Sequence, residues 1–128
     1  MGDVSDAIAD RLESEPLAAY LATTTEDRPH VAPVWYRYEA GTVEITTTGR
    51  KLSNIRENPR VALAVQKAAA GVPEWVVTLR GTAAVIEDED ANREARRRIN
   101  RKYGADEDDW AENTLVRIEV GSASLTEY

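Results

Sequence analysis

Turn residues divide the chain into short segments that are rich in β-branched and small apolar residues. Such spacing is typical of antiparallel strands. We expect six strands, at residues 17–25, 30–38, 42–48, 61–65, 74–86 and 114–120. A chain of 128 residues is long enough for one core and too short for a second catalytic domain. The sequence therefore predicts a single domain over residues 1–128.

Helical spacing of apolar residues appears in three places. A short helix is expected over residues 4–12 with Asp3 or Ser5 as its N-cap, another over 51–58, and one long helix over 88–103. We expect a loop at 68–73 and a bend or bulge at Gly81. Six strands with these helices predict a mainly β, α+β fold that forms a closed or partly closed barrel.

Composition excludes several function classes. The chain has no cysteine and a single histidine, His30, so we expect neither thiolate chemistry nor a metal site. A net charge of −7 repels phosphates and anionic lipids, which favours a small-molecule substrate over nucleic acid or a membrane. No apolar run is long enough to span a membrane, and the N-terminal residues lack the layout of a signal peptide. We therefore expect a cytoplasmic protein.

The long helix contains a cluster of arginines that resembles a nucleic-acid surface. Its apolar positions recur every four residues, and Arg93, Arg97 and Arg101 fall on the opposite face. Acidic runs flank both ends of the helix. This pattern favours a solvated helix face over a nucleic-acid site.

A strand end rich in hydroxyl groups runs into a basic pair at a predicted helix start. Thr46, Thr47 and Thr48 precede a glycine, and Arg50 and Lys51 follow it. Helix N-termini carry unpaired N–H groups and partial positive charge, so this arrangement suits a phosphate group. A capped helix with exposed basic residues explains the spacing equally well.

The strand expected at 30–38 contains a proline in its middle. Pro33 removes a donor from the ladder, so one edge of this strand has to be open or occupied. A planar heterocycle against the strand, with Trp35 or Tyr36 as a wall, accounts for the interruption. An edge strand with two core aromatics is the simpler alternative. Trp110 is likewise either a core aromatic or a lid over a cofactor.

Three segments together resemble the pyridoxamine 5'-phosphate oxidase-like, FMN-binding split-barrel family, particularly its short branch with deazaflavin (F420)-dependent reductases. These segments are LATTTEDRPHVAPVWYRY, TTTGRKLSNIRENPRVALAV and WVVTLRGTAAVI, and the resemblance covers roughly residues 15–120. It implies a six-stranded split β-barrel of the FMN-binding type that assembles as a homodimer with cofactor sites at the interface. It does not extend to the longer C-terminal segment of true pyridoxamine-phosphate oxidases, so we do not expect that reaction.

The resemblance also implies the site residues. The flavin phosphate would be held by Thr46, Thr47, Thr48, Arg50 and Lys51, with Asn54 nearby. Val34, Trp35 and Tyr36 would line the ring, with the backbone around Pro33 at its edge. Trp75 and Val76 would come from the partner chain.

The implied activity is hydride transfer between a bound FMN and a small organic substrate, because side chains without cysteine carry no redox chemistry. No side chain is assigned to acid–base catalysis. One alternative keeps the fold and binds F420, with Arg28 or Arg56 on its acidic tail. Another alternative is a non-catalytic flavin-binding module.

Overall fold

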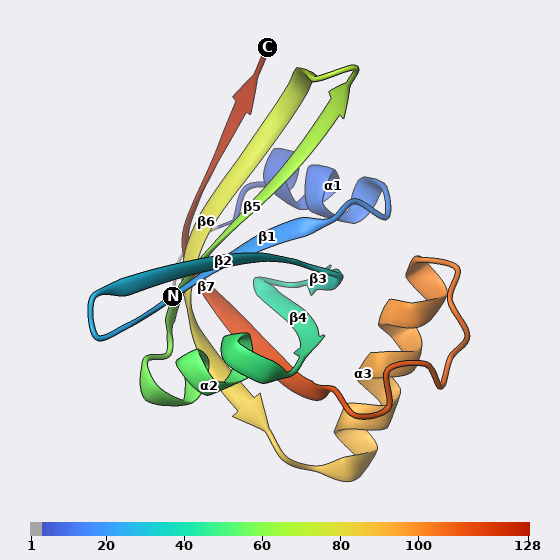
Figure 1. The fold of residues 1–128 in the computed structure, drawn as a ribbon. Helices are drawn as coiled ribbons and strands as arrows, with labels where there is room; N and C mark the ends of the chain where they lie inside the picture. Colours follow the sequence, from blue (N-terminus) through green and yellow to red (C-terminus); the bar gives the residue numbers. More distant parts are fainter. Residues whose placement is uncertain (1–3) are drawn as a thin grey trace.

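The computed structural model describes residues 4–128, which form seven strands and three helices (Figure 1). The strands are β1 (Ala19–Thr25), β2 (Arg28–Val34), β3 (Tyr36–Glu39), β4 (Thr42–Thr47), β5 (Arg60–Ala69), β6 (Val72–Ile86) and β7 (Thr114–Glu127). The helices are α1 (Asp6–Ser14), α2 (Gly49–Glu57) and α3 (Glu89–Lys102).

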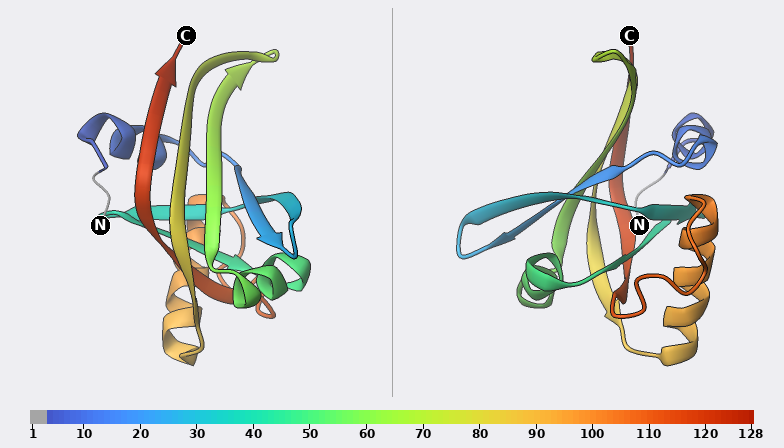
Figure 2. Two further views of the ribbon diagram at one scale, coloured as in Figure 1. Left: turned by 90° about the vertical axis from the view of Figure 1, so that its left-hand side faces the viewer. Right: turned by 45° about the vertical axis from the view of Figure 1, so that its right-hand side comes forward.

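All seven strands belong to one antiparallel sheet in the order β2-β1-β5-β6-β7-β4-β3. The two edge strands, β2 and β3, follow each other along the chain and are separated by Trp35 alone. Because the edges are joined covalently there, the sheet has to curl so that β2 and β3 come together at Trp35, although the two strands do not pair (Figure 2). The mainly β, α+β split barrel is thus confirmed, with seven strands in place of six.

The additional strand arises because the segment expected at 30–38 changes its partner. Val34 pairs with Ala19 of β1, whereas Tyr36 pairs with Ile45 of β4. The alternation of buried side chains continues across Trp35, so the sequence period gives no sign of the break. Pro33 lies in β2 at the sheet edge, where a missing ladder donor is tolerated.

Three hairpins have two-residue turns in which both central residues have positive φ, as in type I′ turns. These residues are Glu26 and Asp27, Ala40 and Gly41, and Ala70 and Gly71. The loop expected at 68–73 is therefore only two residues long. β5 and β6 continue on either side of it and extend beyond the barrel (Figure 1).

The last strand runs to Glu127, beyond the end expected at residue 120. Gly81 of β6 pairs with Val120 and Arg80 pairs with Ser122, so Gly121 is the extra residue of a bulge. The bulge expected at Gly81 is therefore present, but its extra residue lies on the neighbouring strand, β7. Gly81 itself allows close approach, because a Cβ there would collide with the backbone oxygen of Glu119.

The helices bury one face each against the sheet. Ser5 caps α1, where its side chain accepts a bond from Ile8 N–H, and Asp3 lies outside the described residues. α1 contacts β3, β6 and β7, α2 contacts β1 and β6, and α3 contacts β3, β4 and β7 (Figure 2). Within residues 4–128, none of the helices has the length and hydropathy of a membrane span.

Candidate functional site

A pocket of about 280 Å³ lies where the β2–β3 junction, the end of β4 and the start of α2 come together. We call it the threonine pocket. It brings together many of the residues that the sequence predicted for the cofactor. Its lining residues are Ala18, Pro33, Val34, Trp35, Thr46, Thr47, Thr48, Lys51, Trp110 and Asn113.

The end of the threonine pocket at α2 is suited to an anion. Thr48 occupies the N-cap position, yet within the described residues its side chain makes no capping bond, and the first turn carries no acidic residue. The N-terminal N–H groups of α2 are thus not satisfied by a side-chain cap. The Thr47 side chain is buried, and its Oγ1 has no hydrogen-bond partner in residues 4–128. Lys51 adds a positive charge one turn further along.

Gly49 determines how α2 begins. Its φ of +66° lies in the left-handed region, which glycine enters without a steric cost. The chain can therefore turn from Thr48 directly into the helix.

The threonine pocket also has an aromatic wall, which includes Trp35 and Trp110. The Trp35 ring stacks on Tyr103, with centroids 4.6 Å apart and planes 3° from parallel. The Tyr103 hydroxyl donates to the carbonyl of Leu17 at 2.7 Å and accepts from the N–H of Tyr36 at 3.2 Å. Tyr103 at the end of α3 therefore fixes the position of Trp35 at the strand break.

Lys102 also stabilises the strand break at Tyr36. Its Nζ donates to the carbonyl of Tyr36 at 2.8 Å and lies 3.7 Å from the centroid of the Tyr36 ring. Burial, together with the positive charge of Arg37, lowers the pKa of Lys102 to about 8. Burial also raises the pKa of Tyr103 to about 12, although its bond to Tyr36 opposes that shift.

Arg50 and Asn54 do not line the threonine pocket. They line a second, polar cavity of about 410 Å³ on the other side of the α2 N-terminus, which we call the arginine pocket. Its lining residues are Thr25, Glu26, Arg28, Pro29, His30, Arg50, Ser53, Asn54 and Glu57. Arg50 and Lys51 separate because consecutive residues of a helix project about 100° apart.

Within the arginine pocket, Asn54 is fixed by other protein groups. Its amide donates to Thr23 Oγ1 at 3.0 Å and its oxygen accepts from Thr25 Oγ1 at 3.3 Å. In contrast, no ion pair to Arg28 or Arg50 is present among residues 4–128. The buried Nδ1 of His30 also has no hydrogen-bond partner in this part of the chain.

Tyr36, Trp75 and Val76 line neither pocket. Tyr36 is fully buried, and its hydroxyl donates to the carbonyl of Leu12 at 2.7 Å. Burial raises its pKa. Trp75 is buried in the core of its own chain, and Val76 lies on the opposite face of β6 because successive strand residues alternate.

Three arginines of α3, and Arg56, are engaged elsewhere. Arg93 pairs with Asp90, Arg97 with Asp108 and Arg101 with Glu107, as expected of a solvated face between acidic runs. Arg56 pairs with Glu87 at 3.0 Å and lines neither pocket.

The sequence did not point to Ala18, Asn113 and Tyr103 as site residues, and it left Trp110 open between a core aromatic and a lid over a cofactor. A tryptophan within an acidic, polar segment was the available sign for Trp110, whose side chain is 52% exposed at the pocket. Ala18 and Asn113 carry no such sign, because only the folded chain brings them to the strand break.

Comparison with known proteins agrees with this fold. The sequence model described as Pyridoxamine 5'-phosphate oxidase matches residues 4–125. No protein of the curated set matches the chain in sequence.

Proteins whose solved structures have the same fold have several different functions. A structure titled F420 reductase superposes with a TM-score of 0.73 at 23% identity, covering 90% of this chain and 94% of that one. An FAD-binding protein from Mesorhizobium loti gives 0.75 at 21% identity, with 95% and 94% covered. A heme storage protein from Vibrio cholerae gives 0.77 at 15% identity, with 95% and 93% covered. The fold is thus shared by proteins of different function, and the match over residues 4–125 shows that this chain belongs to the pyridoxamine 5'-phosphate oxidase family.

Proposed function

We propose that this protein binds FMN in the threonine pocket and acts as an oxidoreductase on a small organic substrate. One observation carries the proposal: Lys51, three threonines and the backbone of Pro33 to Trp35 line a single cavity. Lys51 and the threonines suit a phosphate, and the strand break with its tryptophan suits a flat ring. A flavin mononucleotide has both groups in one molecule.

The buried hydroxyl of Thr47 supports the phosphate end of the proposal. A buried hydroxyl without a partner costs free energy, and a phosphate oxygen would supply the missing acceptor. Lys51 and the uncapped N-terminus of α2 would contribute charge and further donors. Thr46 and Thr48 line the same cavity and offer additional hydroxyl groups.

The ring end would be formed by the strand break. Pro33 and Val34 belong to an edge strand, and the Trp35 ring is held by Tyr103. A flavin, when bound, supplies hydride-transfer chemistry that the side chains of this cysteine-free chain lack. The protein's own residues would bind the phosphate, orient the ring and keep water from one face of it. No side chain is proposed as an obligatory acid or base.

The lining of the threonine pocket favours a flavin over heme. Heme iron is held in proteins by histidine, cysteine, methionine or tyrosine. None of these residue types lines the threonine pocket, and the single histidine lies in the arginine pocket.

F420 is a second candidate cofactor, which the arginine pocket favours. Arg28, Arg50 and His30 line it together with two carboxylates, Glu26 and Glu57, and neither arginine forms an ion pair among residues 4–128. The acidic tail of F420 would pair with these arginines, whereas FMN has only one phosphate and no such tail. Arg56 would not take part, because it is paired with Glu87.

We further propose that the functional form is a homodimer. The outer face of the sheet presents a shallow apolar hollow lined by Tyr20, Ala22, Val31, Ala62 and Ala64. Tyr20 is 50% and Val31 65% exposed, and exposed apolar patches of this kind mark contact surfaces. Val76 lies on this outer face and could contact a partner. Trp75 could not do so without leaving its own core.

Absorption spectra of the purified protein titrated with FMN and with F420 test the cofactor proposal. We expect one cofactor per chain, and Arg28→Ala to weaken F420 binding while leaving FMN binding unchanged. A protein that takes up neither cofactor would contradict the proposal. Turnover of a substrate by the loaded protein then separates the oxidoreductase from a non-catalytic flavin-binding module.

Sedimentation at micromolar concentration tests the dimer. The proposal predicts a species of twice the 14.2 kDa chain mass. A monomer that binds FMN without loss of affinity would show that one chain completes the pocket.

A further inference from the structure

Trp110 is an unusual aromatic side chain in this structure. It is 52% exposed, it lines the threonine pocket, and its φ of +62° lies in the left-handed region. A bulky residue there costs free energy that the surrounding structure has to offset. Trp110 thus combines an exposed large ring with a strained backbone, and it does so at the threonine pocket.

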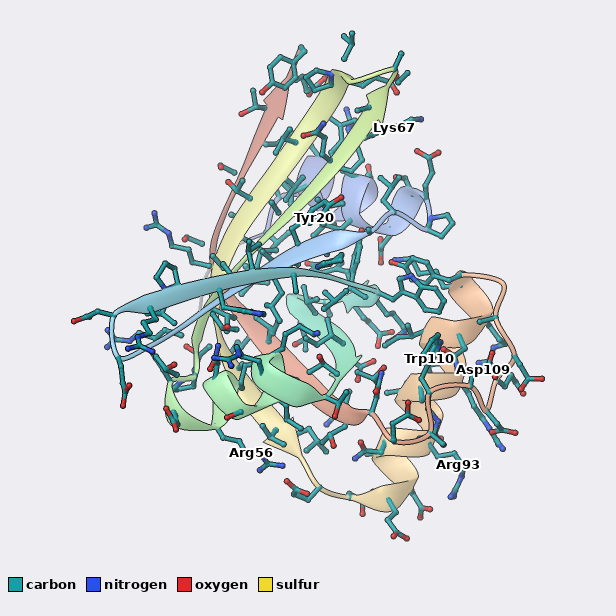
Figure 3. All side chains as sticks on the ribbon, viewed as in Figure 1. Tyr20, Arg56, Lys67, Arg93, Asp109 and Trp110 are labelled. Carbon is teal, nitrogen blue, oxygen red and sulfur yellow. The ribbon has the colours of Figure 1, made fainter. Side chains whose placement is uncertain are left out.

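The segment that carries Trp110 is anchored on α3. Asn100 is 2% exposed, and its amide donates to the backbone oxygens of Glu107 at 3.0 Å and Asp109 at 2.9 Å. An ion pair from Arg97 to Asp108 adds a second attachment. Figure 3 shows Trp110 beside α3, on the side of this segment that faces the strands. The position of the indole is therefore set by groups outside the pocket.

Trp110 and Trp35 form an aromatic corner. Their ring centroids are 6.4 Å apart and their planes meet at 90°. Tyr103 covers one face of the Trp35 ring. Lys51 and the three threonines line the same cavity as these two indoles. The polar groups and the aromatic corner therefore line one cavity, and a flavin carries both a phosphate and a ring.

We propose that Trp110 contacts the cofactor ring and, with Trp35, holds it in the threonine pocket. This inference rests on the proposed flavin binding and adds a residue to it. The exposed indole would gain an aromatic neighbour when the ring enters, which favours binding beyond the apolar area that is buried. Because the backbone at residue 110 is already held in place, this segment loses little conformational freedom when the ring binds.

A ring-only ligand separates the two ends of the pocket. Lumiflavin has the flavin ring and lacks the phosphate, so we compare it with FMN by equilibrium titration. Trp110→Leu should weaken both ligands about tenfold, equivalent to 1.4 kcal/mol. Lys51→Ala should weaken FMN and leave lumiflavin unchanged. Tyr128→Leu is the matched control, because Tyr128 is an exposed aromatic (74%) that lines neither pocket.

Flavin emission gives a second readout that a merely structural role would not produce. Nearby indoles quench flavin fluorescence by electron transfer, and Trp110→Leu removes one of the two indoles proposed beside the ring. FMN bound to this variant should therefore emit more strongly than FMN bound to the wild-type protein, with Trp35 still quenching part of the emission. Trp110→Phe keeps a ring and should recover most of the lost affinity.

The two proposals fail in different ways. If the wild-type protein binds FMN, and Trp110→Leu shows unchanged affinity for lumiflavin and unchanged emission, the role of Trp110 is wrong while flavin binding stands. If the wild-type protein binds neither flavin, both proposals are wrong.

Discussion

Replacing Thr47 by valine should stabilise the protein and weaken its cofactor binding at the same time. The two side chains have nearly the same shape, so the change removes one hydroxyl group. Thr47 is 2% exposed and its Oγ1 has no partner among residues 4–128. An unpaired buried hydroxyl costs about 1–3 kcal/mol. Without bound FMN, the variant should therefore have a free energy of unfolding about 1–2 kcal/mol higher than the wild-type protein.

The effect on FMN has the opposite sign. A hydrogen bond to a charged phosphate contributes about 1.5–3 kcal/mol. Loss of this bond should raise the Kd for FMN by roughly one to two orders of magnitude. Urea unfolding without ligand and FMN titration measure the two effects separately.

Thr23→Val is the matched control for stability. Thr23 is 1% exposed, and its Oγ1 accepts the amide of Asn54 at 3.0 Å. Removing that acceptor should lower the free energy of unfolding by about 1–3 kcal/mol. If Thr47→Val destabilises the protein as much as Thr23→Val does, the Thr47 hydroxyl has a partner in the free protein. Thr47 would then not be a free donor for the phosphate.

Three further changes test the structure around the site. Between about pH 8 and 10 the unfolded chain keeps the Lys102 proton and the folded protein releases it. The free energy of unfolding of the wild-type protein should therefore rise over this range by roughly 1–2 kcal/mol more than that of Lys102→Met. Parallel pH profiles of the two proteins would contradict this. Tyr103→Phe leaves the Leu17 carbonyl and the Tyr36 N–H without their partner and should cost about 1–3 kcal/mol in urea unfolding; an unchanged midpoint would refute it. Gly81→Ala forces β6 away from β7 and should cost about 1–3 kcal/mol, and a variant as stable as the wild-type protein would show that the sheet relaxes freely.

Local patterns predicted most of the fold, because they depend on neighbouring residues. The three helices follow from apolar spacing, and the hydroxyl-rich end of β4 before Lys51 identified one end of the threonine pocket. The partner change at Trp35 could not be read in the same way. Burial alternates without interruption from Val34 to Tyr38, and only the order of strands in the sheet reveals the break.

Side-chain directions were the weaker part of the sequence analysis. Arg50 and Lys51 are adjacent in the chain, yet they line different cavities because a helix turns between them. Tyr36 was expected beside a ring, and its side chain instead bonds to the carbonyl of Leu12 in the core. Trp110 lies 75 residues from Trp35, so only the folded chain shows that the two rings meet.

A crystal structure of the FMN complex is the most direct test of the account. We predict that the phosphate lies within hydrogen-bond distance of Thr47 Oγ1 and Lys51 Nζ, with the ring against Pro33 to Trp35. Density for FMN in the arginine pocket, with the threonine pocket vacant, would contradict the account.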